Sequence, residues 1–331
     1  MSAWGGGGLM GEGSHIQWTH HTFNPWRGCT HVSPGCEHCY AEALSKRNPA
    51  TLGTWGANGE RVMAAESYWR QPERWNRAAE KAGERHRVFC ASLADVFEDR
   101  PELWDPRVRL FSLIARTPHL DWLLLTKRPE NAKKLIGGAA MWCDVDQGLH
   151  YDGFDLVDAW PWPNVWLGTT VEDQRRADER IPVLLDTPAA VRFLSCEPLL
   201  GPVDLDVHLP AAPNGYHCER GDHEWSGPAL TDPCIQCGLE RDRPYIDWLI
   251  VGGESGPKAR PMDLAWARSL VEQGRAAGVA TFVKQLGARP VWRTRAQQEP
   301  GRSATPWATR HRAGGDPDEW PADLRVREFP S

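Results

Sequence analysis

The sequence has no excess of basic residues, no long apolar run and no basic start followed by an apolar segment. Its 38 Lys and Arg residues are outnumbered by 44 Asp and Glu residues, which gives a formal net charge of −6. This balance argues against a general nucleic-acid coat protein, although a local basic groove stays compatible with it. No stretch approaches the length of a membrane span, and the glycine-rich residues 1–14 resemble a flexible leader rather than a signal peptide. We therefore expect a cytoplasmic protein without a membrane partner.

The nine cysteines are an odd number, and six of them fall into two groups with ligand-like spacing. In a reducing compartment this indicates metals rather than disulfides. The first group is Cys29, Cys36 and Cys39, spaced C-x6-C-x2-C on a loop rich in proline and glycine. Three thiolates without an obvious local fourth ligand leave one coordination position open, which favours a 4Fe–4S cluster. The alternatives are a zinc site completed by His31 or His38, and cysteines that are simply buried.

Six short apolar runs, at residues 86–97, 120–129, 164–173, 191–198, 247–256 and 281–287, end in small, polar or charged residues. Residues 19–24, just before the cysteine loop, are counted as a seventh strand, and helices are expected at 105–117, 130–136, 172–185 and 264–278. Strands that alternate with helices build parallel βαβ units. The pattern predicts an α/β fold, a partial (β/α) barrel of TIM type with about six to seven parallel strands. The polar strand ends would then line one mouth.

This main domain is expected to cover residues 15–290, followed by a C-terminal extension at 291–331. Two segments, 137–163 and 205–246, break the alternation of strands and helices, and we interpret them as insertions. Residues 41–83 have helical spacing interrupted by Asn-Pro, Asn-Gly and Gln-Pro pairs, which predicts two helices and a turn.

The insertion at 205–246 contains the second group of ligand-type residues. Its members are Cys218, His223, Cys234 and Cys237, with His217 as an alternative to His223. Four such ligands from two short knuckles are typical of a closed tetrahedral zinc site. The segment has too few apolar residues to fold by core burial, and bound zinc would supply the missing free energy. We therefore predict a small zinc-ribbon-like insertion with a structural Zn²⁺.

The motifs on the cysteine loop and at the strand ends occur in a specific order. They are Phe23–Cys29 with Cys36-x2-Cys39-Tyr-Ala, Leu125–Pro129, Gly168–Glu172, Ser195–Pro198, Gly252–Gly256 and the tail at 314–327. Together they resemble a family of phage and bacterial three-cysteine-motif proteins of unknown function. That family is in turn similar to radical S-adenosylmethionine (radical SAM) proteins. The resemblance covers about residues 15–290 and the tail.

The resemblance implies a 4Fe–4S cluster on the first loop, held by Cys29, Cys36 and Cys39, with S-adenosylmethionine as a second cofactor. Gly252, Gly253 and Glu254 resemble the Gly-Gly-Glu strand end that holds the methionyl amine in radical SAM enzymes. Glu197 and Lys127 also follow expected strands and are candidates for cofactor binding. A reductant protein such as a ferredoxin or flavodoxin would supply electrons, and the phage relationship suggests a nucleic acid or nucleotide as substrate.

Three hypotheses about function follow from these patterns. The first is a radical SAM-type oxidoreductase or lyase. The second is a non-SAM iron–sulfur protein that senses redox state or docks on nucleic acid, because the loop has C-x6-C where radical SAM loops have C-x3-C. The third is a zinc-only interaction protein, based on the second cysteine group.

Overall fold

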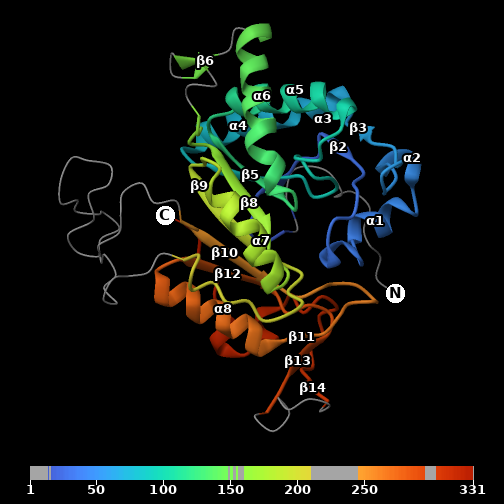
Figure 1. Ribbon diagram of the computed structural model, residues 1–331, viewed down its shortest axis with the longest axis vertical. Helices are drawn as coiled ribbons and strands as arrows, with labels where there is room; N and C mark the ends of the chain where they lie inside the picture. Colours follow the sequence, from blue (N-terminus) through green and yellow to red (C-terminus); the bar gives the residue numbers. More distant parts are fainter. Residues whose placement is uncertain are drawn as a thin grey trace, which may run out of the picture. The chain divides into compact units, whose positions relative to one another are not determined.

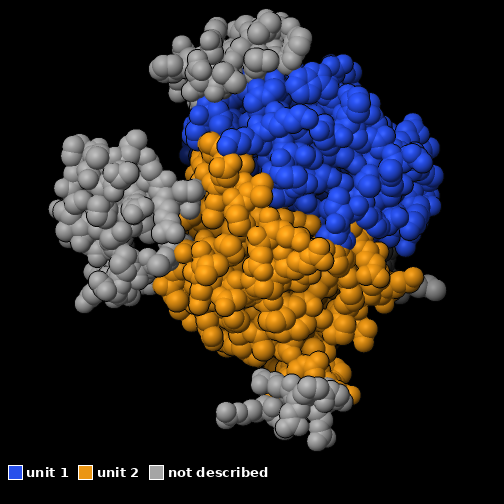
Figure 2. All heavy atoms as spheres, viewed as in Figure 1, with its two compact units in different colours: residues 1–33, 39–167 blue, residues 34–38, 168–331 orange. Residues whose placement is uncertain are grey.

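A computed structural model gives the fold of the chain. It describes residues 14, 16–147, 150–151, 154–155, 160–209, 245–294 and 303–330. The chain divides into two compact units, residues 1–33 with 39–167 and residues 34–38 with 168–331 (Figure 2). The cysteine loop contributes to both units, because its middle segment, 34–38, clusters with unit 2.

The main sheet has seven strands in the order β1-β4-β5-β8-β9-β10-β12 (Figure 1). They are β1 (His21–Thr22), β4 (His86–Cys90), β5 (Leu120–Thr126), β8 (Val165–Thr170), β9 (Val191–Cys196), β10 (Trp248–Gly252) and β12 (Ala280–Gln285). The pairs β1–β4, β4–β5, β9–β10 and β10–β12 are parallel. All seven predicted strands are confirmed. These strands alternate with helices along the chain, which confirms the α/β class. The strand order ends at β1 and β12 without closing, so the barrel is partial, as predicted.

In unit 1 the crossovers between the sheet strands are mostly helical. Its further elements are β2 (Trp26–Arg27), η1 (Pro34–Cys36, whose residues cluster with unit 2), α1 (Tyr40–Ser45), α2 (Pro49–Leu52), β3 (Val62–Met63), α3 (Glu66–Trp69), α4 (Gln71–Ala82), η2 (Pro101–Leu103), α5 (Trp104–Ala115), α6 (Pro129–Gln147), β6 (His150–Tyr151) and β7 (Phe154–Asp155). Helices α5 and α6 pack against each other (Figure 1).

The prediction of two helices and a turn for residues 41–83 was wrong in detail. The segment forms three short helices, α1 to α3, the 12-residue helix α4, and the strand β3. Two of the proline pairs interpreted as breaks begin helices instead, since Pro49 starts α2 and Pro72 lies in the first turn of α4. Proline is tolerated there because the first helical N–H groups have no partner within the helix.

Helix α6 is longer than the predicted helix at 130–136, since it continues to Gln147. The start of the predicted insertion at 137–163 is therefore helical, and β6 and β7 form an antiparallel pair within it. Close to the end of the segment, Trp162 is buried against Phe111 with ring centroids 5.8 Å apart. This end of the segment belongs to the core of unit 1.

Unit 2 has two long helices beside its sheet strands. Its further elements are α7 (Gln174–Leu185), β11 (Met262–Asp263), α8 (Leu264–Ala277), β13 (Pro290–Trp292), β14 (Thr305–Pro306), η5 (Pro317–Glu319) and η6 (Ala322–Leu324). The helices α7 and α8 lie close to the predicted bounds. Gly278 ends α8 in a left-handed conformation with φ 69°, as expected for a glycine cap.

The chain end covers the free edge of β12. Val283 N–H donates to the carbonyl of Val326 at 2.9 Å, and Phe282 forms an antiparallel bridge with Arg327. The ring of Phe329 packs on Phe282 with centroids 5.3 Å apart. A covered edge cannot pair with another chain, so this part of the predicted 291–331 extension protects the sheet.

The strands inside the sheet are largely apolar and buried. The side chains of β10 are buried throughout, and those of β8 likewise. Aromatic residues fill much of the interior, with Phe23 packed edge-on against Trp122 at 5.6 Å. Among the described residues, no helix combines the length and the hydropathy needed to cross a membrane.

Candidate functional site

The cysteine loop of unit 1 is fixed to the carboxyl ends of β1 and β4. Asn24, just after β1, accepts a hydrogen bond from Leu93 N–H at 2.7 Å and donates to the Ser92 hydroxyl at 3.1 Å. Gly28 N–H donates to the Leu93 carbonyl at 3.1 Å, and its φ of 103° suits glycine alone. Parallel strands bring their carboxyl ends to one edge. Cys29 is therefore held at that edge.

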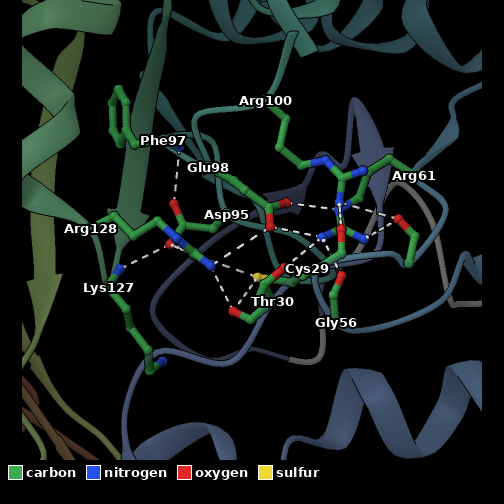
Figure 3. Close-up of polar contacts among 12 residues, drawn as sticks. Cys29, Thr30, Gly56, Arg61, Asp95, Phe97, Glu98, Arg100, Lys127 and Arg128 are labelled. Atoms are coloured by element: carbon green, nitrogen blue, oxygen red, sulfur yellow. Dashed lines mark hydrogen bonds and ion pairs between the residues drawn. The ribbon is translucent and has the colours of Figure 1, made fainter. Parts of the chain in front are cut away.

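Arg128, which follows β5, meets Cys29 at this edge (Figure 3). Its Nη1 lies 3.7 Å from Cys29 Sγ and 2.9 Å from Asp95 Oδ2, while Nη2 donates to the Thr30 carbonyl at 2.6 Å. Both Arg128 and Asp95 are buried, with side chains 8% and 7% exposed. One guanidinium thus links the first cysteine of the loop to the ends of β4 and β5.

Asp95 is held by donors from the end of β5 and from its own turn. Its Oδ1 accepts from the Thr126 hydroxyl at 2.7 Å and from Phe97 N–H at 3.0 Å. Its Oδ2 accepts from Lys127 N–H at 3.0 Å in addition to Arg128. A carboxylate with four donors has a fixed orientation, and so does the guanidinium that it holds.

A second buried ion pair lies under the same loop. Arg61 donates from Nε and Nη2 to the two oxygens of Glu98, both at 2.7 Å, with side chains 0% and 5% exposed. The remaining N–H groups of Arg61 bond to the Thr30 hydroxyl at 2.8 Å and to carbonyls of the 54–59 turn (Figure 3). The sequence analysis did not single out Arg61 or Glu98, because nothing local marks two residues that pair across 37 positions.

The surroundings keep the thiol of Cys29 protonated when no metal is bound. Burial raises its pKa to about 12, and the carboxylates of Asp95 and Glu98 act in the same direction. The Arg128 guanidinium opposes this shift. A metal that replaced the thiol proton would make this sulfur anionic beside a fixed cation.

In unit 2, Glu254 and Arg260 hold the middle segment of the cysteine loop. Glu254, buried after β10, accepts four hydrogen bonds on its two oxygens. Three come from Arg260, at 2.7, 3.0 and 2.6 Å, and one from His38 Nδ1 at 3.1 Å. Arg260 also donates to the Pro34 carbonyl at 2.9 Å and to Glu37 at 3.0 Å. These hydrogen bonds lower the pKa of Glu254 although burial opposes them.

Glu172, after β8, makes a further contact with the same segment. Its Oε1 accepts from Gly35 N–H at 3.3 Å, and its Oε2 accepts from Arg180 Nη1 at 2.8 Å. The carboxylate is fully buried. Two buried glutamates, one after β8 and one after β10, thus position residues 34–38.

A third charged group in unit 2 joins the ends of β9, β10 and β12. Lys284 Nζ donates to both oxygens of Glu197 at 2.7 and 2.8 Å, and Gln285 donates to Glu197 at 2.9 Å. A Cβ on Gly252 would come within 3.2 Å of Glu197, and one on Gly253 within 2.4 Å of the Leu286 carbonyl. Both glycines therefore permit close packing at this strand end.

The predicted site residues have different surroundings. Cys29 lies among the Arg128 and Asp95 contacts, Cys36 ends η1, and Cys39 precedes α1; none is in a disulfide and each is partly exposed. Within the ranges that the structure describes, no three His, Cys, Asp or Glu residues are arranged to hold a metal ion. The predicted zinc ligands, Cys218, His223 (or His217), Cys234 and Cys237, lie outside the described residues.

Of the residues predicted to bind a cofactor, Glu254 and Glu197 make the contacts given above. The backbone N–H of Lys127 bonds to Asp95, while its side chain points away from Cys29 (Figure 3). Neither Arg260 nor Arg180 was predicted from the sequence. Each pairs with a glutamate of a strand-end motif, and only the structure shows that pairing.

Fold and site define an α/β protein of parallel strands with a cysteine loop fixed at the strand ends. The chain belongs to the family described as protein of unknown function (DUF5131), whose model matches residues 13–309. Comparison with curated proteins and with solved structures gives no match.

Proposed function

We propose that this protein is an iron–sulfur protein of radical SAM type, with Cys29, Cys36 and Cys39 as ligands of a 4Fe–4S cluster. The observation that carries the proposal is the environment of Cys29, a thiol held at the strand-end edge beside the Arg128 guanidinium. Three cysteines on one loop, none of them in a disulfide, supply the soft anionic donors that such a cluster takes. A neighbouring cation suits a site whose ligands are anions, so the donor type fits the group, and the loop would have to bring the three sulfurs closer together to bind it.

A bound cluster, reduced by an external electron donor, would supply the one electron that cleaves a sulfur–carbon bond of S-adenosylmethionine, which would give methionine and a 5′-deoxyadenosyl radical for hydrogen abstraction from a substrate. The chain's own contribution is to position the cysteine loop. Arg128 and Asn24 would fix its first part, and Glu254 with Arg260 would fix residues 34–38. The open strand ends would receive the substrate, for which we retain a nucleic acid or nucleotide.

For S-adenosylmethionine we retain Gly252, Gly253, Glu254, Glu197 and Lys127 as candidate contacts. Glu197 and Lys284 carry charges opposite to those of the methionyl amine and carboxylate, and binding would have to replace the ion pair that they form with each other. The structural zinc proposed for Cys218, His223, Cys234 and Cys237 rests on their spacing alone. A ferredoxin or flavodoxin stays the proposed electron donor.

A second candidate is an iron–sulfur protein that does not use S-adenosylmethionine. It is favoured by the state of Glu254, whose oxygens already accept four hydrogen bonds from Arg260 and His38. A carboxylate engaged in this way has little capacity left for a methionyl amine.

Anaerobic reconstitution tests both candidates. We expect the wild-type protein to hold iron and acid-labile sulfide in similar amounts and Cys29→Ser to lose them. The control Cys143→Ser, at a cysteine of α6 that belongs to neither ligand-like group, should keep them. Addition of dithionite and S-adenosylmethionine should then release 5′-deoxyadenosine. Iron–sulfur content without cofactor binding in a calorimetric titration would support the second candidate, and zinc without iron would exclude both.

A further inference from the structure

Arg128 is held rigidly at the sulfur of Cys29. Its Nη1 is shared between Cys29 Sγ, at 3.7 Å, and Asp95 Oδ2, at 2.9 Å. The backbone N–H of Arg128 donates to the Thr126 hydroxyl at 2.8 Å, which fixes the start of the side chain. The Arg128 side chain is thus held at its backbone by Thr126 and at its guanidinium by Asp95 and Thr30, and it does not depend on Cys29 for its position.

The other buried cation under the loop is already matched. Arg61 gives two hydrogen bonds to the two oxygens of Glu98, and its side chain is fully buried. Arg128 is the cation whose N–H points at the sulfur, and it lies beside two carboxylates, with Asp95 at 2.9 Å and Glu98 at 3.7 Å. Both carboxylates disfavour negative charge on Cys29 and Arg128 opposes them, so removing the Arg128 charge would leave the sulfur facing the carboxylates alone.

We propose that Arg128 is a positioning residue that raises the reduction potential of the cluster held by Cys29. This inference rests on the proposed function. When one electron from a reductant such as dithionite enters the cluster, the site gains one negative charge and no proton. A fixed cation in contact with a ligand sulfur favours the more negative state. Hydrogen bonds to the sulfurs are among the factors that set such potentials.

The test is a potentiometric titration of anaerobically reconstituted protein, followed by electron paramagnetic resonance. Arg128→Gln removes the positive charge. Arg128→Lys keeps the charge but removes the forked guanidinium group, whose two Nη atoms bond to Asp95 and to the Thr30 carbonyl. Lys134→Gln is the matched control, because it removes a positive charge from unit 1 at a side chain that is 74% exposed and paired with Asp99 at 3.0 Å. We expect a more negative potential for Arg128→Gln, a value closer to wild type for Arg128→Lys, and no change for Lys134→Gln.

An unchanged potential in Arg128→Gln, or an equal shift in Lys134→Gln, would overturn the proposal while the cluster itself stands. Loss of iron from both Arg128 variants would also overturn it, because the fork rather than the charge would then be required. If Arg128→Gln alone fails to assemble the cluster, the reduction potential of Arg128→Lys decides. A value close to wild type would support the proposal, and a large shift would overturn it, because Arg128→Lys keeps the positive charge. Absence of iron and sulfide from the wild-type protein would instead refute the proposed function.

Discussion

The buried ion pair under the cysteine loop gives the sharpest test of the fold's energetics. The change is Glu98→Gln, which keeps the size of the side chain and removes its charge. Arg61 would then remain buried with a neutral partner and with hydrogen bonds that reach only carbonyls and the Thr30 hydroxyl. The substitution removes the charge and also replaces one acceptor oxygen by an amide NH2 group that faces an N–H of Arg61, because both Glu98 oxygens accept from that side chain.

The expected loss follows from burial. Two unit charges about 4 Å apart attract by about 4 kcal/mol at an effective dielectric constant of about 20. Breaking a buried pair by removing one partner costs about 3–5 kcal/mol, because the remaining charge is left uncompensated. Since total stabilities are about 5–15 kcal/mol, Glu98→Gln should remove a large part of the free energy of unfolding of this unit.

The assay is urea unfolding followed by tryptophan fluorescence, with Glu66→Gln as the matched control. Glu66 also binds an arginine through two hydrogen bonds, from Arg109 at 2.5 and 2.6 Å, but the two side chains are 74% and 42% exposed. The control should unfold near the wild-type urea concentration, since water screens exposed pairs. Equal midpoints for the two variants would refute the claim that burial makes the Arg61 pair important.

Three further predictions concern other parts of the fold. Burial, with the nearby charges of two other histidines, lowers the pKa of His21 to about 4. The free energy of unfolding should therefore fall by roughly 3 kcal/mol as the pH drops from about 6.5 to about 4, because the unfolded chain binds a proton at His21 that the folded protein excludes. His21→Phe, which keeps a ring against Trp75, should remove most of this pH dependence when unfolding is measured across the same range. Gly168→Ala would place a Cβ 2.4 Å from the ring of Phe193, and thermal unfolding should report a loss of about 1–3 kcal/mol, with no loss contradicting the close packing. Glu254→Gln should weaken the contact with residues 34–38, so a chelator should remove iron faster than from wild type, and equal rates would count against a positioning role.

Much of the fold was accessible from local patterns. Six of the seven sheet strands were predicted because each lies in an apolar run bounded by polar or turn residues, and such runs are typical of a buried parallel sheet. The short β1, His21–Thr22, was predicted from its place just before the cysteine loop. The ends of α7 and α8 were marked by Thr187-Pro188 and Gly278. The helices within 41–83 were less accessible, since Pro49 and Pro72 start helices as readily as they end them.

The sequence by itself determined the parallel α/β architecture and the presence of a three-cysteine loop after the first strand, because periodicity and spacing are local properties. Only the tertiary structure decided which charges meet the loop. Arg128 and Cys29 are separated by 99 positions, and His38 and Glu254 by 216. Such pairs are selected by the sheet order and by the need to match buried charges, and neither leaves a local mark in the sequence.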